Sequence, residues 1–415
     1  MAFPSVEQQL EVLLRGCEAV YSPAELRAKL EGSREQDKPL RVKLGLDPTA
    51  PDIHLGHTVV FRKIREFQDF GHKAVVIVGD YTAMVGDPSE KSKTRPTLSR
   101  DQVEANAQTY LDQAGRVLDT RPERLELRRN SEWLADLSLA DALRLASKMT
   151  VARMLERDTF EKRYKGGVEI YLHEFLYPLL QGRDSVAIEA DIELGGSDQT
   201  FNNLVGRDLQ RDAGQPPQVV MIMPILVGLD GVEKMSKSLG NYVAVTDSAH
   251  DMFGKLMSVP DELMRNYFEL LTAVDSSETN TLCDLAKTHP MEAKKRLART
   301  IAEEFHSADD ADRAQSEWEA IHQKSAAGAG MVVPEGTPTV ALEREQMQDG
   351  KVRLLDLVML CGFASSRSEG RRLAAEGGIR LNGQAIQDVN EPVEVKTGDV
   401  LQRGKRRFAQ LEVGQ

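Results

Sequence analysis

The stretch from Asp47 to His57 reads D-P-T-A-P-D-I-H-L-G-H and decides the fold. Before it, Leu40 to Leu46 alternates apolar with other residues, which predicts a strand. After it, Thr58 to Phe70 repeats its apolar residues at helical spacing, and Gly71 follows where a helix would end. The stretch therefore joins a strand to the N-terminus of a helix.

Three residues of this stretch indicate a phosphate site. His54, Gly56 and His57 fall at the predicted helix N-terminus, where free backbone N–H groups and the helix dipole attract anions. The two imidazoles add donors for phosphate or ribose oxygens, and Gly56 leaves room for a ring or sugar beside the backbone. Two solvated histidines at an ordinary helix start are the alternative, because so short a motif needs context.

Lys234 to Ser238, K-M-S-K-S, supplies that context. It follows an apolar strand, Val219 to Leu226, and a turn at Asp230-Gly231. The pentapeptide places two ammonium groups on a loop rich in hydroxyl groups. H-L-G-H and K-M-S-K-S, in this order and about one nucleotide-binding fold apart, resemble the signature pair of the class I aminoacyl-tRNA synthetases.

Length and cysteine content limit the class of protein. The 415 residues allow two or three domains with sizeable cores. The three cysteines, Cys17, Cys283 and Cys361, lie far apart and predict neither a disulfide framework nor a metal site, so we expect a reducing compartment. The N-terminus lacks a basic start with an apolar run, and no stretch approaches a membrane span, so we expect a cytoplasmic protein.

The net charge of −12 is unevenly distributed. Residues 351–415 contain 11 Lys and Arg against 8 Asp and Glu, a net charge of +3, and the preceding residues carry the remaining −15. A weakly basic tail on an acidic body favours local contact with RNA.

Two further glycine-containing segments follow predicted strands. Gly79 to Ser89 follows the strand Lys73 to Gly79, and Ile192 to Gln199 passes from a strand into a glycine turn and a helix. Ligands of open α/β sheets bind at such strand ends, and a carboxylate there, such as Asp198, can accept from ribose hydroxyls. Lys91 and Arg95 follow the first segment, and a loop beside a phosphate site would use such cations, although a solvated charge run is the usual case.

A polar stripe lies on the next predicted helix. Tyr177, Gln181 and Asp184 fall at i, i+4 and i+7, on one face. Plain amphipathicity would give the same pattern.

The rest of the chain predicts helices and then a compact tail. Four helices are expected between residues 246 and 323, a Gly- and Pro-rich linker follows, and Asn382-Gly383 predicts a two-residue hairpin. The expected domains are 1–240, 241–325 and 345–415, with 326–344 as linker. A candidate phosphate-binding surface of the tail comprises Arg367, Arg371, Arg372, Lys405, Arg406 and Arg407.

With these motifs, Leu40 to Tyr242 resembles the catalytic half of the bacterial tyrosyl-tRNA synthetase family. The matching motifs are D-P-T-A-P-D-I-H-L-G-H, V-G-D-P-S, Y-x3-Q-x2-D, G-G-S-D-Q and K-M-S-K-S. Val352 to Leu411 resembles the RNA-binding module named after the fourth protein of the small ribosomal subunit, and the helices between match by position only. The resemblance implies a Rossmann-like α/β catalytic domain with a parallel sheet, an all-α domain and a small α+β RNA-binding domain.

The resemblance also implies roles for site residues. On the ATP side, it assigns the outer phosphates to His54 and Thr49, the ribose and adenine to His57 and Gly56, and the departing pyrophosphate to Lys234 and Lys237, helped by Lys91 and Arg95. Met235 and Ser236 of the loop also belong to the ATP site, Asp198 binds the ribose, Gly196 packs near the adenosine and Gln199 lies by the reacting carboxylate. On the tyrosine side, Asp87, Tyr177 and Gln181 hold the ammonium and Asp184 accepts from the phenol.

One position departs from the family pattern. Many relatives carry a tyrosine two residues before the glycine of the G-x-D-P-T stretch, as second partner of the phenol, and here that residue is Lys43. The implied activity is tyrosine–tRNA ligation with ATP and its Mg²⁺, and with tRNA(Tyr), in a homodimer that uses no protein-bound metal and no membrane. The alternatives are a tryptophanyl-tRNA synthetase and a non-catalytic RNA-binding protein on a synthetase fold.

Overall fold

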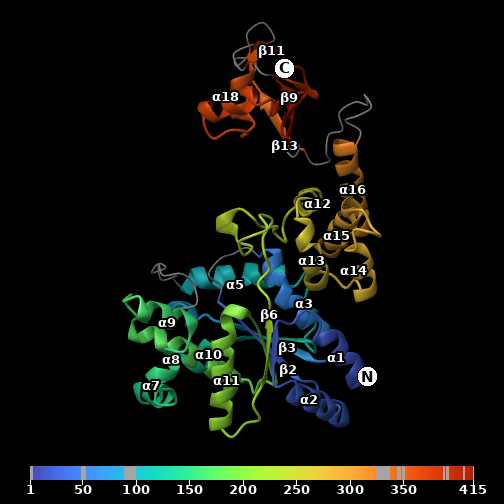
Figure 1. Ribbon diagram of the computed structural model, residues 1–415. Helices are drawn as coiled ribbons and strands as arrows, with labels where there is room; N and C mark the ends of the chain where they lie inside the picture. Colours follow the sequence, from blue (N-terminus) through green and yellow to red (C-terminus); the bar gives the residue numbers. More distant parts are fainter. Residues whose placement is uncertain are drawn as a thin grey trace. The chain divides into compact units, whose positions relative to one another are not determined.

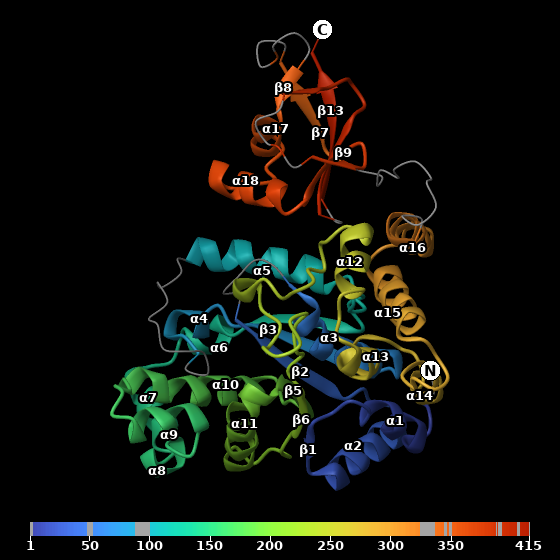
Figure 2. The ribbon, with the colours of Figure 1, turned by 45° about the horizontal axis from the view of Figure 1, so that its top comes forward.

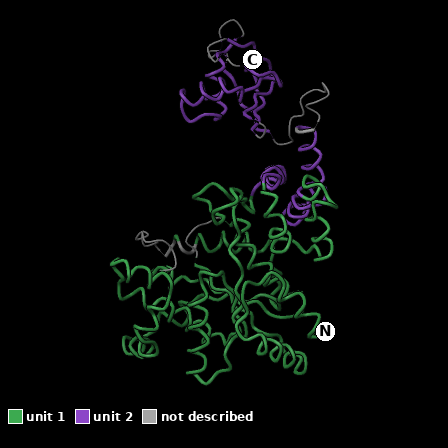
Figure 3. Tube along the Cα trace, in the orientation of Figure 1, with its two compact units in different colours: residues 1–246, 259–293 green, residues 247–258, 294–415 purple. Residues whose placement is uncertain are grey.

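The computed structural model describes residues 3–47, 53–87, 100–323, 337–343, 347, 351–386, 388, 392–404 and 407–414. The chain forms two compact units, one of residues 1–246 with 259–293 and one of residues 247–258 with 294–415 (Figure 3). Among the described residues, none of the helices has the length and apolar character needed to cross a membrane.

The first unit is built on a six-stranded sheet in the order β1-β6-β5-β2-β3-β4. Its strands are β1 (Ala19–Tyr21), β2 (Arg41–Leu46), β3 (Lys73–Val78), β4 (Leu125–Arg129), β5 (Ile192–Gly196) and β6 (Val219–Met223). All pair in parallel except β1, which is antiparallel to β6. Every residue of β6 is buried, as expected for an interior strand of a sheet covered by helices on both sides.

The order of the strands reverses between β2 and β5. From β2 the chain proceeds to β3 and β4 in one direction, and β5 and β6 lie in the other. Helix α3 (Leu55–Asp69) lies on one side of the sheet, and α10 (Leu176–Ala187) and α11 (Thr200–Asp212) lie on the other (Figures 1 and 2). Ligands of open α/β sheets bind at such a reversal, at the carboxyl ends of the strands.

Shorter helices complete this unit. They are α1 (Val6–Leu13), α2 (Pro23–Gln36), α4 (Thr82–Val85), α5 (Arg100–Ala114), α6 (Ser131–Leu134), α7 (Leu139–Ala146), α8 (Val151–Met154), α9 (Asp158–Lys165), α13 (Met264–Leu271) and α14 (Ser276–Leu282), with 3-10 turns η1 (Leu172–Phe175), η2 (Ser197–Gln199), η3 (Lys237–Leu239) and η4 (Asp261–Leu263). Helix α14 comes in addition to the four helices that the sequence predicts between residues 246 and 323.

Helix α2 begins without a serine cap, although Ser22 and Glu25 stand at the spacing of a capping box. Proline occupies the start of the helix, but Ser22 has φ 70° and its side chain makes no capping hydrogen bond. Instead, Arg207 donates to Ser22 Oγ over 3.2 Å and pairs with the Glu25 carboxylate at 2.9 Å. A long-range guanidinium therefore takes both groups that a capping box would use.

The second unit begins with three helices, α12 (Ala249–Leu256), α15 (Pro290–Phe305), which crosses the boundary between the units, and α16 (Ala308–Gln323). Lys295 Nζ lies 2.8 Å from Glu319 Oε1, an ion pair between α15 and α16. The expected helical character of this stretch is confirmed.

The tail is a small α+β module. Its main sheet has the order β10-β9-β12-β13-β7, and β8 pairs with β11. Its elements are β7 (Thr339–Leu342), β8 (Lys351–Arg353), α17 (Leu354–Leu360), α18 (Arg367–Ala375), β9 (Ile379–Leu381), β10 (Gln384–Ala385), β11 (Pro392–Glu394), β12 (Val400–Arg403) and β13 (Arg407–Val413). Asn382 and Gly383 both have positive φ, 51° and 82°, and join β9 to β10 as the predicted hairpin turn.

The start of the tail differs from the expectation. Residues 326–344 are expected as linker, but β7 within them pairs in parallel with β13, Thr339 opposite Gln410. The tail sheet therefore begins before residue 345, and the other domain boundaries stay predictions.

Candidate active site

A cleft of about 1680 Å³ opens at the carboxyl ends of β2, β3 and β5, where the strand order reverses. It brings together predicted residues from five separate stretches of sequence: His54, Gly56, His57, Asp87, Tyr177, Gln181, Asp184, Gly196, Asp198, Gln199, Lys234, Met235, Ser236 and Lys237. Thr49, Lys91 and Arg95 lie outside the described residues.

The two histidines stand at the start of α3. His54 is the N-cap residue, and its Nδ1 accepts from the Gly56 N–H over 3.2 Å. His57 Nδ1 accepts from the His54 N–H over 3.2 Å, and the two rings lie 3.9 Å apart. A Cβ at residue 56 would meet the His54 ring at 2.9 Å, so glycine there makes room for the imidazole.

Both imidazoles are neutral near pH 7. Burial is the first cause that lowers the pKa of His54, to about 3, and the pKa of His57, to about 4, and the Lys234 ammonium lowers both further. Because each Nδ1 accepts a backbone hydrogen bond, the single proton of each ring is on Nε2. Each ring is thus a neutral N–H donor that keeps its proton.

The lysine loop after β6 is held by Asn241. Asn241 Oδ1 accepts from the Ser236 N–H over 2.8 Å, and its Nδ2 donates to Lys234 O over 3.1 Å and to Asp230 Oδ2 over 2.7 Å. Asn241 therefore fixes both ends of the segment that presents Lys234 to the cleft.

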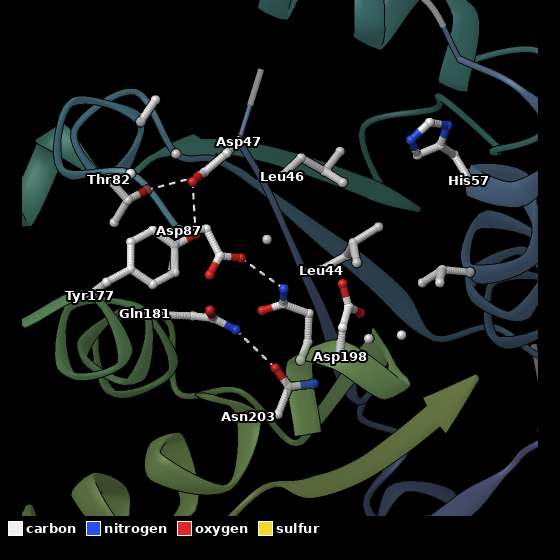
Figure 4. A pocket seen from close by; sticks show the side chains of 18 of the residues that line it. Leu44, Leu46, Asp47, His57, Thr82, Asp87, Tyr177, Gln181, Asp198 and Asn203 are labelled. Carbon is white, nitrogen blue, oxygen red and sulfur yellow. Dashed lines mark hydrogen bonds between the residues drawn. The ribbon is translucent and has the colours of Figure 1, made fainter. Parts of the chain in front are cut away.

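Tyr177 of α10 donates to a buried carboxylate. Its hydroxyl lies 2.7 Å from Asp47 Oδ2, and Thr82 Oγ1 donates to Asp47 Oδ1 over 2.9 Å (Figure 4). Burial raises the pKa of Asp47 to about 7, with the charge of Asp87 adding to the rise. These hydrogen bonds hold the end of β2 against α10 and α4.

Asp184 of α10 is a second buried acceptor that lines the cleft. Trp133 Nε1 donates to its Oδ1 over 2.8 Å, and Asn130 Nδ2 lies 3.4 Å from its Oδ2. Burial raises the pKa of Asp184 to about 7, against the Lys43 charge and these two donors. The carboxylate is oriented by two neutral donors and faces the cleft.

The remaining polar residues form a connected set. Gln199 Nε2 donates to Asp87 Oδ2 over 2.8 Å, and Asp87 also pairs with the buried Arg157 at 3.2 Å. Gln181 Nε2 donates to Asn203 Oδ1 over 2.9 Å (Figure 4). Burial, followed by the charge of Asp87, raises the pKa of Asp198.

Many lining residues are absent from the sequence-based prediction. The polar ones that bond to predicted site residues or lie beside them include Asp47, Thr82, Asn130, Glu193 and Asn203. The D-P-T stretch already contains Asp47, so its position after a strand was a usable signal. Thr82 and Glu193 lie within the two glycine-containing segments, Gly79 to Ser89 and Ile192 to Gln199, but the pattern there does not single them out. Asn130 and Asn203 enter the cleft from elements without a recognisable motif.

The basic residues of the tail lie partly on one exposed helix. Arg367, Arg371 and Arg372 are exposed on α18, and Arg407 is exposed at the start of β13. Arg367 pairs with Asp356 at 2.9 Å. Lys405 and Arg406 lie outside the described residues.

Comparisons with known proteins match nearly the whole chain. A family model described as tRNA synthetases class I (W and Y) matches residues 35–323, and an S4 domain model matches residues 352–401. The chain is 48% identical to the tyrosine–tRNA ligase of Symbiobacterium thermophilum over 99% of both chains. It is 47% identical to that of Deinococcus radiodurans over 98% of this chain and 96% of that one. Its fold is similar to that of the Archaeoglobus fulgidus tyrosyl-tRNA synthetase solved with L-tyrosine, with a TM-score of 0.59 at 22% identity, over 75% of this chain and 100% of that one.

Proposed function

The chain belongs to the class I tRNA synthetases, and within them to the tyrosine–tRNA ligases, and on this premise we propose how its residues divide the reaction. The enzyme joins tyrosine and ATP as tyrosyl-adenylate, releases pyrophosphate, and transfers tyrosine to the terminal adenosine of tRNA(Tyr). Full-length relatives named as tyrosine–tRNA ligases disfavour the tryptophan-specific and the non-catalytic alternatives.

The tyrosine substrate lies between β2 and α10. Asp184, buried and held by Trp133 and Asn130, accepts the hydrogen bond of the substrate phenol. The Asp87 carboxylate, with Tyr177 and Gln181 beside it, receives the substrate ammonium. The convergence of these residues with His54 and Lys234 in one cleft is the observation that carries the proposal.

Activation needs charge stabilisation rather than a protein nucleophile, because the substrate carboxylate itself attacks the α-phosphate. ATP enters with its Mg²⁺, and negative charge grows on the departing pyrophosphate. Lys234 and Lys237 neutralise that charge, and His54 donates an N–H to it without losing a proton. Thr49, Lys91 and Arg95 are expected to assist at the phosphates.

The nucleoside occupies the other half of the cleft. Asp198 accepts from the ribose hydroxyls, His57 and Gly56 lie beside the ribose and adenine, Gly196 packs on the adenosine, and Gln199 lies by the reacting carboxylate. Met235, only 4% exposed, and Ser236 place the lysine loop over the nucleotide.

The transfer step needs the tRNA held in place, which is chiefly a positioning problem. The arginines of α18 and Arg407 supply exposed cations for the phosphates of tRNA(Tyr). We place the enzyme in the cytoplasm, where the tRNA is charged and where its three free cysteines stay reduced.

Exposed apolar residues on three elements that are close in sequence support a homodimer. Leu139 and Leu143 on α7, Val151 on α8 and Leu172 on η1 are 77%, 62%, 62% and 83% exposed. These four large apolar side chains, exposed within residues 139–172, favour an interaction site in this stretch. A second copy of this chain is the proposed occupant.

Leu172→Asp tests the dimer, because a carboxylate at the most exposed of these positions opposes burial. Light scattering should give a dimer for the parent and a monomer for the variant, and Leu285→Asp, at another exposed leucine, is the control. A monomeric parent protein would contradict the proposal.

One assay tests the proposed chemistry. Exchange of labelled pyrophosphate into ATP should depend on tyrosine and should not respond to tryptophan. Exchange that tryptophan supports, or no exchange with either amino acid, would overturn the assignment of the cleft.

A further inference from the structure

We propose that Lys43, paired with Glu193 beneath the tyrosine end of the cleft, is a positioning residue whose contacts and charge prepare Asp184 for the substrate phenol. The inference rests on the proposed role of Asp184. In this proposal Lys43 does not contact the substrate. The tyrosine of the family pattern would contact the phenol directly, whereas Lys43, at the same position, acts on it only through Asp184.

The register of the sheet creates the pair. Lys43 of β2 lies directly opposite Glu193 of β5, the two strands that meet where the strand order reverses. The Lys43 Nζ lies 2.7 Å from Glu193 Oε1, and their side chains are 0% and 1% exposed. A buried ion pair costs much desolvation and persists only with further hydrogen bonds.

Those further bonds reach α10. Lys43 Nζ donates to the Gln181 carbonyl over 3.0 Å and to Ser185 Oγ over 2.7 Å. With Glu193 as third acceptor, all three N–H donors of the ammonium are used. The lysine is therefore saturated by protein groups and has no donor left for a phenol.

The acceptors bracket Asp184 on its helix. Gln181 precedes it by about one turn and Ser185 follows it directly. Ser185 Oγ in turn donates to Glu193 Oε2 over 3.2 Å, and Gln218 donates to the same oxygen. Strand β2 and strand β5 thus hold the turn of α10 from which Asp184 faces the cleft.

The pair also acts on Asp184 through charge. Lys43 opposes the burial that raises the pKa of Asp184 to about 7, and it does so more strongly than Glu193 acts in the other direction. The charge of Asp184 also raises the pKa of Asp47 and of Tyr177. The two donors to Asp184, Trp133 and Asn130, are neutral. Lys43 is therefore the cation that favours the ionised, phenol-accepting form of Asp184.

The test uses Lys43→Met, Glu193→Gln and the double variant in the full-length enzyme. The kcat/KM for tyrosine and for phenylalanine is measured by pyrophosphate exchange from pH 6 to pH 9. Lys63→Met is the matched control, because Lys63 is also buried and donates to two backbone carbonyls, those of Val12 and Arg15, away from the cleft.

The double variant removes both charges, so it avoids leaving one buried ion without its partner. We expect its tyrosine-to-phenylalanine ratio to fall roughly ten-fold at pH 7 and to recover at higher pH, since Asp184 ionises later without the lysine. Glu193→Gln keeps the Lys43 cation and removes an anion that raises the pKa of Asp184. The pH profile of the tyrosine-to-phenylalanine ratio should therefore move to lower pH. Lys63→Met should leave both the ratio and its profile unchanged.

Two results separate the inference from its premise. If Asp184→Ala leaves the ratio unchanged, the proposed role of Asp184 fails. If Asp184→Ala collapses the ratio but the double variant keeps the parent ratio and pH profile, Lys43 is only structural and the inference is overturned. Shifts of the same sign in Glu193→Gln and the double variant would also overturn it.

Discussion

His54 illustrates how burial sets the chemistry of a single residue. A charged imidazolium beside Lys234 would repel the lysine, whereas the buried neutral ring donates one hydrogen bond from Nε2 at no such cost. Asp184 shows the opposite case, because burial brings its pKa to about 7 and leaves its ionisation sensitive to neighbouring charges. Burial thus sets the protonation of both the proposed phosphate donor, His54, and the proposed phenol acceptor, Asp184.

The phosphate-side residues should act mainly in the transition state. Alanine at His54, Lys234 or Lys237 is expected to lower the rate of adenylate formation by roughly 10²–10³-fold, as for other lost charge-stabilising donors. The dissociation constant of tyrosine should change little. Stopped-flow rates and equilibrium binding measure the two quantities, and an equal loss in both would show uniform binding instead.

Asp184→Ala should abolish the choice between tyrosine and phenylalanine. A buried acceptor is left unpaired by phenylalanine, and tyrosyl-tRNA synthetases are themselves the known example of rejection by roughly 10⁴–10⁵-fold on this ground. The ratio of kcat/KM values in pyrophosphate exchange measures the loss. An unchanged ratio would place the phenol elsewhere.

At the scale of elements, the sequence predicts what depends on local pattern. The strands and helices around the cleft are found because their apolar periodicity is strong. Fourteen predicted site residues line the cleft because their motifs stand at strand ends or, for Tyr177, Gln181 and Asp184, on one face of α10. Asn130 and Trp133 are missed because they reach Asp184 only through the packing of the loop after β4 and α6 on α10. Strand β7 is missed for the same reason, since its partner β13 lies far away in sequence.

His72 links elements in a way that depends on pH. It is fully buried, its Nδ1 accepts from the Leu40 N–H over 3.2 Å, and its Nε2 donates to Gln9 Oε1 of α1 over 2.9 Å. Burial lowers its pKa to about 4. The unfolded chain, with a histidine pKa near ~6.5, binds a proton that the folded state excludes, so this contribution to stability is full above that pH and falls as the pH drops toward 4.

Comparison of the parent with His72→Asn isolates the pH-dependent contribution of His72 to the free energy of unfolding. The parent's advantage in free energy of unfolding should shrink by roughly 2 kcal/mol between pH 6.5 and pH 5, at about 1.4 kcal/mol per pH unit. Urea unfolding at each pH measures it, with the exposed His173→Asn as control. A difference that stays constant with pH would show that His72 does not resist protonation.

At the scale of the whole molecule, chemistry and RNA contact occupy different parts of the chain. The cleft is lined by residues 44–238, whereas the tail carries the positive charge balance. The tail also has a hydrophobic core of its own, from Leu342 to Leu411, with buried leucines of α17 at its centre. A module with a separate core can fold without the cleft, and the cleft can be complete without the module.

We therefore expect a chain that ends at Gln323, the last residue of α16, to make tyrosyl-adenylate at close to the parent rate. It should charge tRNA poorly, and its tRNA binding should depend less steeply on salt, because the phosphate contacts of the tail are lost. Pyrophosphate exchange and tRNA charging are measured side by side. A full-length variant with alanine at Arg367, Arg371 and Arg372 is the control, which should lose part of the salt dependence while it keeps the tail. Loss of both activities in the shortened chain would show that the tail supports the catalytic fold, and unimpaired charging would show that its basic face is ordinary solvated surface.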